Sequence, residues 1–191
     1  MGEWASYGLA DFLMFSPQTW WRLVERYNAA VWPAHAGALL AGIAAFVLAQ
    51  SRPAAGALLL AAAWAWVGWA FHWQRYAEIF LAGPWLAAAS GLEALLLVAA
   101  AATLRADPQR GWRAANAAGI AIVLFYPLLA PLAGRPLRQA ETFGLLPDPT
   151  ALATLAWLLA CSLPPWSRIA LALIPALSLV LGLLTRAQFA Q

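Results

Sequence analysis

Long apolar runs alternate with short polar segments along most of the chain, and this pattern predicts a bundle of transmembrane helices. A helix that crosses the hydrocarbon core of a bilayer needs about 20 predominantly apolar residues. Several runs approach or reach that length, and most of them are bounded by proline, arginine or a polar turn. The sequence therefore predicts an all-α fold in a single integral membrane domain, residues 1–191, with spans at 33–49, 54–72, 85–104, 114–133, 150–163 and 168–185.

The segment before the first span, residues 16–32, has an amphipathic pattern. Ser16 is a favourable N-cap, and Pro17 fits the first helical turn. One face would carry Trp20, Val24, Tyr27 and Val31, and the other Gln18, Arg22, Glu25 and Arg26. This pattern is typical of an interfacial helix that lies in the headgroup plane. A water-soluble amphipathic helix packed on a loop is the alternative.

The composition agrees with a membrane protein and argues against nucleic-acid binding. Of the 191 residues, 64% are hydrophobic and 10% are charged, whereas soluble domains carry roughly 25% charged residues. The net charge of +3 comes from arginines that lie in ones and twos near the ends of apolar runs. Such scattered arginines act as topology signals, and they form no basic patch that could follow a phosphate backbone. We expect the lipid bilayer as a partner and no nucleic acid.

The charge distribution suggests an orientation. Six spans place both termini on one side, together with the longer loops and most of the acidic residues. The loops on the other side are short, and Arg105, Arg110 and Arg113 crowd one of them. Because basic residues in short loops favour the cytoplasmic side, we expect a multi-pass protein of the bacterial inner membrane with periplasmic, outward-facing termini. The arginine counts of the two sides are similar, so the reversed orientation stays open.

The segment FHWQRYAEIF, residues 71–80, places polar side chains between two apolar runs, on the side of the termini. Arg75 and Glu78 are three residues apart and can form an ion pair on one helical turn. Alternatively, His72, Arg75, Tyr76 and Glu78 contribute to a site for a small or lipid-like ligand.

Glu93 and Tyr126 form a second candidate site. Glu93 follows Pro84 by nine residues, which places it about 13 Å inside a hydrocarbon core of about 30 Å. A charge at that depth is costly, so the carboxyl needs a partner or a proton. The short connection between the third and fourth spans brings Tyr126 to the same depth, and we expect a Glu93–Tyr126 hydrogen bond. The pair is either a contact between helices or a ligand-binding or proton-relay site.

His35 and His72 are weak candidates for a haem or metal site. The tight turn between the first two spans makes them antiparallel neighbours, and the two histidines then differ in height by roughly 6 Å. Two imidazoles without a third ligand are weak evidence for a metal, so no cofactor is predicted. A histidine bonded to a backbone carbonyl or to water is the commoner case.

Tryptophan is abundant, and its positions suggest an aromatic belt. Trp66, Trp69 and Trp73 follow helical spacing near the outer end of the second span, with Trp32 and Trp85 at a similar depth. Rings at this depth typically anchor a protein at the membrane surface. A site for a flat ligand or a cation is the alternative.

The sequence contains no established catalytic signature. It has no HExxH, no GxSxG, no P-loop and no glycine-rich dinucleotide fingerprint. The pattern favours a protein that is not an enzyme. An intramembrane enzyme that uses Glu93 and His72 stays open as an alternative.

Three segments in order resemble a known family: residues 7–33, the WAFHWQRYAEI stretch at 69–79, and the TFGLLPDPTALATL stretch at 142–155. The order resembles a family of small bacterial polytopic membrane proteins catalogued as domain of unknown function 6064. The resemblance implies that His72, Arg75, Tyr76 and the 147–150 turn belong to the shared pattern of the family. It passes on no activity.

Together these patterns favour a protein that binds or moves a small or lipid-like molecule at its outward face. The first alternative is a non-catalytic accessory subunit of a larger membrane complex, or a homo-oligomer. Alanine-rich faces in the second and third spans would suit such packing, but they suit packing within a monomer equally well.

Overall fold

The computed structural model describes residues 15–107 and 114–189, and this part of the chain is helical and contains no strand. The helices are α1 (Pro17–Val31), α2 (Ala34–Val47), α3 (Pro53–Trp66) with its π-helical continuation η3 (Val67–Trp73), η4 (Tyr76–Glu78), α4 (Gly83–Thr103), α5 (Ala114–Phe125), η6 (Tyr126–Leu128), α6 (Leu129–Leu132), η7 (Leu137–Gln139), α7 (Pro147–Ala160) and α8 (Pro165–Phe189). The all-α prediction is therefore confirmed.

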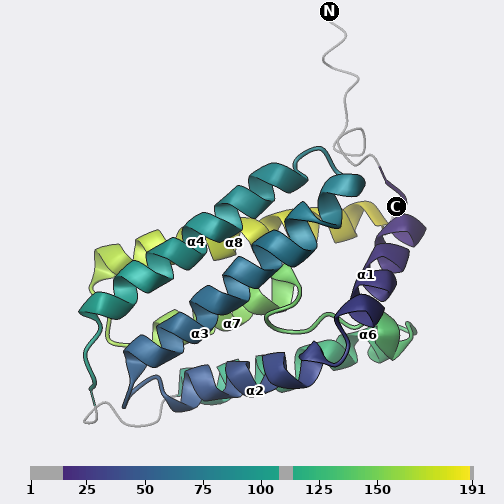
Figure 1. Cartoon of the computed structure of the whole chain (residues 1–191). Coiled ribbons are helices and arrows are strands. Elements are labelled where there is room, and N and C mark those ends of the chain that lie inside the picture. Colours follow the sequence, from purple (N-terminus) through teal and green to yellow (C-terminus); the bar gives the residue numbers. More distant parts are fainter. Residues whose placement is uncertain (1–14, 108–113, 190–191) are drawn as a thin grey trace, which may run out of the picture.

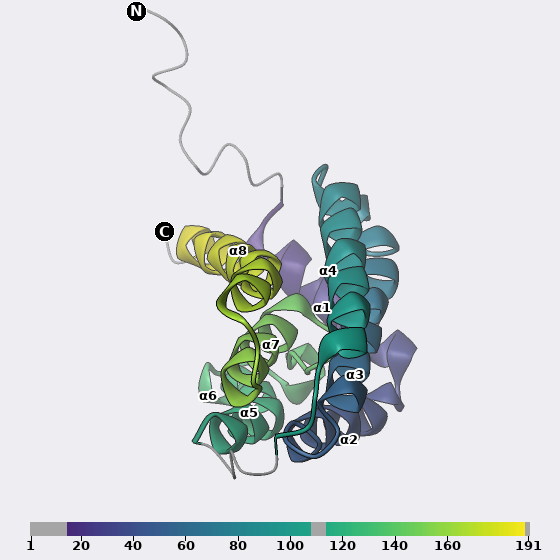
Figure 2. The same cartoon turned by 90° about the vertical axis from the view of Figure 1, so that its left-hand side faces the viewer.

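The long helices share a common direction, and α1 lies across one end of them (Figure 1). The axes of α1 and α2 meet at an angle of 90°. In the view along the bundle, α7 lies near the middle, with α3 and α4 to its right, α8 above it and α5 below it (Figure 2). The C-terminal end of α8 reaches the same end of the bundle as α1.

The helix predicted for residues 16–32 is confirmed as α1. The Ser16 side chain accepts a hydrogen bond from the Thr19 backbone N–H at 3.2 Å, which satisfies one of the free donors at the helix start. The apolar face of α1 packs on η3 and η4, with the ring centroids of Trp20 and Tyr76 5.2 Å apart and those of Tyr27 and Phe71 5.3 Å apart. The aromatic face thus fixes α1 across the end of the bundle.

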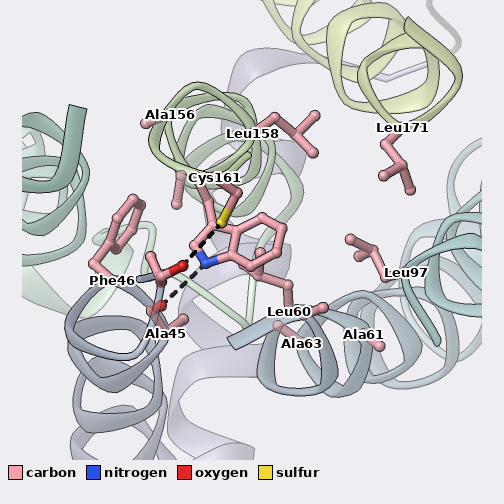
Figure 3. Close-up of a cluster of buried hydrophobic side chains, with 14 of the residues drawn as sticks. Ala45, Phe46, Leu60, Ala61, Ala63, Leu97, Ala156, Leu158, Cys161 and Leu171 are labelled. Carbon is pink, nitrogen blue, oxygen red and sulfur yellow. Dashed lines mark hydrogen bonds between the residues drawn. The ribbon is translucent and has the colours of Figure 1, made fainter. Parts of the chain in front are cut away.

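The short helix α7 is the centre of the packing. Ten of its 14 residues are buried, and several of these are alanines, which let neighbouring backbones approach. The Trp157 indole N–H donates to the Ala45 carbonyl of α2 at 3.0 Å, and the Cys161 thiol donates to the Ala49 carbonyl at 3.6 Å (Figure 3). These side-chain bonds join α7 to α2 within the hydrophobic core.

Within residues 15–107 and 114–189, four helical segments are long and apolar enough to cross a membrane, and there is a fifth if the bent pair α1–α2 is counted as one span. The four are Pro53–Glu78, Gly83–Thr103, Ala114–Leu132 and Pro165–Phe189. The spans predicted at 33–49 and 150–163 correspond to α2 and α7, which have 14 residues each. A helix of that length is about 21 Å long, shorter than a hydrocarbon core of about 30 Å. The structure therefore supports four to five candidate spans.

Exchanging Gly119 for alanine tests the close contact between α5 and α2. A Cβ at Gly119 would overlap the Phe46 ring, whereas a Cβ at Gly91 on α4 meets nothing within 4 Å. Overpacking typically costs about 1–3 kcal/mol, and the helix propensity gained is about 1 kcal/mol at either position. We expect Gly119→Ala to lower the midpoint of thermal unfolding in detergent, and Gly91→Ala to leave it unchanged or raise it. Equal midpoints for the two variants would contradict the described packing.

Candidate functional site

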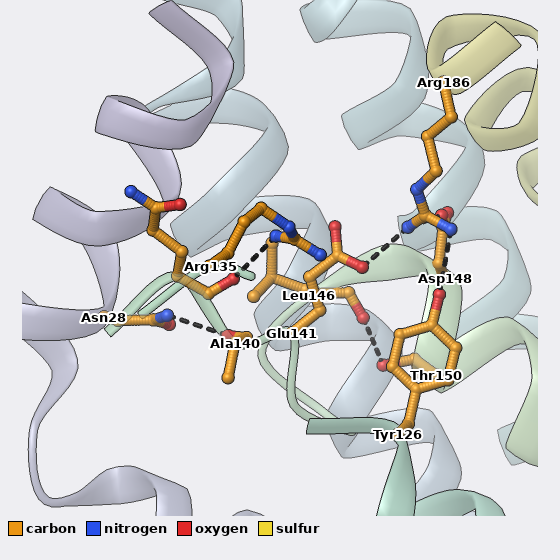
Figure 4. A network of polar contacts seen from close by, with 10 residues as sticks. Asn28, Tyr126, Arg135, Ala140, Glu141, Leu146, Asp148, Thr150 and Arg186 are labelled. Atoms are coloured by element: carbon orange, nitrogen blue, oxygen red, sulfur yellow. Dashed lines mark hydrogen bonds and ion pairs between the residues drawn. The ribbon is translucent and has the colours of Figure 1, made fainter. Parts of the chain in front are cut away.

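Two buried carboxylates share one guanidinium at the end of the bundle where α1 lies (Figure 4). One amino group of Arg186 lies 2.6 Å from a Glu141 oxygen and 2.5 Å from an Asp148 oxygen. The other donates to the Tyr126 hydroxyl at 3.2 Å. Glu141 and Asp148 are 6% and 7% exposed, so these ionisable groups meet largely away from solvent. We call Arg186, Glu141 and Asp148 the ion cluster.

The α7–α8 hairpin brings two members of the ion cluster together. Asp148 lies in the first turn of α7, where the helix dipole favours an acid, and Arg186 lies in the last turn of α8, where it favours a cation. Gly182 precedes Arg186 by one helical turn, and a Cβ there would come within 2.5 Å of both Asp148 carboxyl oxygens. The absent side chain at Gly182 therefore leaves the space that the Asp148 carboxylate occupies.

The third member, Glu141, is held by the loop that leads into α7. The Thr150 hydroxyl accepts from the Gly144 backbone N–H at 2.8 Å and donates to the Leu146 carbonyl at 2.7 Å. Gly144 has a positive φ of 74°, a conformation that side chains with a Cβ rarely adopt. These contacts fold the loop over the N-terminus of α7 and bring Glu141 to Arg186.

Arg186 stands between an outer groove and an inner cavity. The outer groove has a volume of about 570 Å³, and its polar lining residues are Tyr126, Arg135, Glu141 and Arg186. Its apolar lining residues include Trp21, Leu129, Leu132 and Phe189. The inner cavity has a volume of about 30 Å³, which is room for one or two water molecules. Its lining residues include His72, Tyr76, Asp148, Thr185 and Arg186.

Arg135 is the second cation of the outer groove. Its guanidinium carbon lies 3.6 Å from the centroid of a Trp21 ring, and one nitrogen donates to the Gln139 carbonyl at 3.4 Å. Burial lowers the pKa of Arg135, with the nearby Glu141 carboxylate acting in the opposite direction. Among the described residues, no carboxylate forms an ion pair with Arg135. The groove thus holds one cation without a directly paired anion.

The environment of Asp148 favours its protonated form. Burial is the main cause that raises the pKa of this carboxyl above its usual range, and the nearby Glu141 carboxylate adds to the rise. Arg186 acts in the opposite direction. The ion cluster therefore combines a strong ion pair with a carboxyl that takes up a proton more readily than a carboxyl in water.

The predicted Glu93–Tyr126 hydrogen bond is wrong. The Tyr126 hydroxyl is bonded to Arg186 instead, and Glu93 is fully buried with neither carboxyl oxygen hydrogen-bonded within the described chain. The prediction took α4 and α5 as neighbours because of the short connection between them. However, α4 packs on α3, η3 and α8, whereas α5 packs on α2 and α7, and Figure 2 shows α4 and α5 on different sides of α7.

The polar residues of the 71–80 segment divide between two places. The buried His72 is hydrogen-bonded through Nδ1 to the Ser90 hydroxyl at 3.0 Å, and with Tyr76 it lines the inner cavity. Arg75 and Glu78 line a separate groove against α1. The described residues form three ion pairs, and none of them joins Arg75 to Glu78.

The two histidines have different partners. The Nε2 atom of His35 lies 3.2 Å from the Asn28 side-chain oxygen, whereas His72 bonds to Ser90. Within residues 15–107 and 114–189, no group of three or more His, Cys, Asp or Glu side chains could hold a metal ion. No cofactor was predicted, and a haem or metal at His35 and His72 stays a hypothesis without added support.

Sequence reasoning missed the ion cluster. It placed Arg186, Glu141 and Asp148 on the side of the termini but named none of them as a site. The available signal was an arginine near the end of the last apolar run with two acidic residues on the same predicted side. The contacts depend on the crossing of α7 and α8 and on the Gly144 turn, and neither follows from helical periodicity.

Comparisons with known proteins identify the family of the chain. The sequence profile of a family of unknown function, DUF6064, matches residues 17–189, so the chain belongs to this family. The resemblance found in the sequence is therefore confirmed. No curated protein and no solved structure matches the chain.

Removing the cation of the ion cluster tests whether the two carboxylates depend on it. Arg186→Met leaves two buried carboxylates without their partner. We expect the free energy of unfolding in detergent to fall by about 2–3 kcal/mol. This is below the cost of about 3–5 kcal/mol for breaking a fully buried pair, because the Arg186 side chain is 35% exposed. The triple variant Arg186→Met/Glu141→Gln/Asp148→Asn should recover more than half of that loss.

Arg138→Met is the matched control for this experiment. Arg138 pairs with Glu25 at 2.9 Å, but its side chain is 70% exposed, and exposed pairs contribute about 0–1 kcal/mol. Thermal unfolding of all variants at one pH checks the expectation. A triple variant as unstable as Arg186→Met would show that the buried carboxylates are not the cause of the loss.

Proposed function

We propose that the protein is an integral membrane protein that binds a small amphipathic, lipid-like molecule in the outer groove, with Arg135 and the ion cluster as its polar anchor. One observation carries this proposal: Arg186 is bound to two buried carboxylates and lines both the groove and the inner cavity. The proposed site is therefore continuous with the buried polar part of an otherwise apolar bundle.

The ion cluster is hard to explain by stability alone. Removing charged groups from water costs free energy, and well-packed apolar side chains often replace a buried ion pair without loss. Ionisable residues inside a membrane protein usually face a cavity or mark the path of a substrate or ion. The ion cluster fits the first description, because it lines the inner cavity and also opens onto the outer groove.

The outer groove has the size and the chemistry of a ligand site. Its volume of about 570 Å³ lies within the range of roughly 300–1,000 Å³ for small-molecule pockets. Apolar side chains form one part of the wall, and Arg135, Glu141 and Arg186 form the other. A molecule with an apolar body and a polar end that accepts hydrogen bonds from Arg135 fits this division.

We further propose that the chain is one multi-pass domain of the bacterial inner membrane, with α1 in the outer headgroup layer. α1 crosses the end of the bundle at 90° to α2, as an interfacial helix would. Five tryptophans near this end have large exposed fractions: Trp32, Trp66, Trp69, Trp73 and Trp85. Exposed indole rings are favoured at the membrane–water interface, which supports an interfacial position for this end of the bundle.

A second candidate function, an accessory subunit of a larger membrane complex, has one specific observation in its favour. An open groove between α3 and α4 is lined by apolar and small side chains, including Ala61, Ala65, Ala88 and Gly91. Small residues let helices of membrane proteins approach closely. A subunit would use this groove for a partner helix and would have no need of a ligand in the outer groove.

Native mass spectrometry after gentle extraction from the host distinguishes the two functions. We expect the 20.5 kDa chain to carry a discrete extra mass, and Arg135→Gln to lose it because the unpaired cation of the outer groove is gone. Arg138→Gln, in which an exposed arginine outside the groove is exchanged, should keep the extra mass. Release with other polypeptides at a fixed stoichiometry, and no small molecule, would support the subunit function instead.

Reporter fusions after Gln191 test the proposed orientation. A phosphatase that is active only in the periplasm should be active in this fusion, and a fluorescent protein that folds only in the cytoplasm should be dark. The reverse pair of results would place the C-terminus and the outer groove in the cytoplasm.

A further inference from the structure

We propose that Arg22, Arg26 and Arg75 form a binding site for a phosphate group, in a groove between α1 and the turn that follows η3. The groove has a volume of about 330 Å³ and is also lined by Thr19, Leu23, Glu78 and Ile79. It shares no lining residue with the outer groove. The inference is thus independent of the proposed ligand site.

The fold brings the three arginines together from two elements. Arg22 and Arg26 are four positions apart on α1 and therefore lie on one face of the helix. Arg75 follows the end of η3 and lies on the opposite wall of the groove. The packing of Trp20 on Tyr76 and of Tyr27 on Phe71 fixes α1 against this segment. The spacing between the two walls is therefore set by the aromatic core beneath them.

The charges of the groove are unbalanced. Three guanidinium groups face one carboxylate, that of Glu78, so the groove has an excess of two positive charges. Glu25, the other acid on α1, is bound elsewhere: it pairs with Arg138 at 2.9 Å and accepts from the Gln139 side chain at 3.3 Å. Within the described part of the chain, none of the three arginines of the groove has an ion-pair partner.

The chemistry of the groove suits a phosphate group. Arginine presents planar sets of N–H donors that match phosphate oxygens, and such charge-assisted bonds are among the strongest hydrogen bonds in proteins. A phosphate diester carries one negative charge, and a monoester carries up to two near neutral pH. A monoester therefore matches the excess of two positive charges, and a diester offsets one of them. The apolar side chains of Leu23 and Ile79 provide contact for the carbon atoms of the ester.

Two sources can supply this phosphate group: the headgroup of an anionic lipid, or a soluble phosphate ester. Both would bind the arginines through the same oxygens. The two sources differ in whether an attached acyl chain adds binding energy, so probes with and without acyl chains separate them.

The experiment measures binding of dihexanoyl phosphatidylglycerol to the purified full chain in a neutral detergent, by native mass spectrometry at constant ionic strength. Dihexanoyl phosphatidylcholine is the probe with no net charge, and sn-glycerol 3-phosphate is the soluble competitor. We expect the phosphatidylglycerol to bind more tightly than the phosphatidylcholine. Arg22→Gln/Arg75→Gln should weaken the phosphatidylglycerol complex at least about tenfold, because it removes a charged donor from each wall.

Two further variants keep the test specific. Glu78→Gln removes the one carboxylate among the described residues that line the groove and should tighten binding, which a general loss of folding would not do. Arg52→Gln/Arg105→Gln removes the same charge from exposed positions outside the groove and should leave binding unchanged. Displacement by sn-glycerol 3-phosphate would identify soluble esters as ligands, and no displacement would identify lipid headgroups.

Three results would overturn the proposal. The first is equal binding of the charged and the zwitterionic probe, and the second is an equal loss of affinity in the two double variants. The third is weaker binding by Glu78→Gln. The midpoint of thermal unfolding of each variant, measured in the same detergent, shows that a loss of binding does not come from unfolding.

Discussion

The ion pair between Arg186 and its two carboxylates governs how one end of this bundle is built. Glu141 and Asp148 are buried, so little water is available to hydrate either carboxylate. The Arg186 guanidinium therefore has to contact both of them. Asp148 can lie against α8 because Gly182 has no side chain. The loop before α7 must fold back over the helix start, which the positive φ of Gly144 permits. The arrangement of α7, α8 and this loop thus follows from the need to pair two buried carboxylates with one half-buried guanidinium.

The short central helix explains why a polar site forms at this depth. The first turn of α7 is buried from Asp148 to Ala151, so the N-terminus of this 14-residue helix lies inside the bundle rather than at its surface. The free backbone donors and the helix dipole at that N-terminus favour an acid, and Asp148 occupies the position. The apolar part of α7 is held by the indole–carbonyl bond from Trp157 to Ala45. The same helix therefore serves as the core of the fold and as one wall of the inner cavity.

Periodicity and composition sufficed to predict the all-α class, the helix at residues 16–32 and its aromatic face, because these depend on local sequence. The contacts between polar side chains could not be predicted from periodicity and composition. The Glu93–Tyr126 prediction failed because consecutive helices were taken as neighbours, whereas α4 and α5 pack on different helices. Likewise, Arg75 and Glu78 have the spacing of an ion pair on one helical turn. They line the groove between α1 and the turn after η3 without forming an ion pair with each other. Contacts that depend on the order of the helices around α7 could be found only from the structure.

The proposed function places a ligand in the outer groove, against Arg135 and the ion cluster. The most direct measurement is an experimental structure of the protein extracted from its own host without harsh detergent. We expect density for a bound molecule between α1, the η6–α6 segment and the C-terminal end of α8, with its polar end at Arg135. A groove that is empty, or that is filled by side chains of a partner protein, would contradict it.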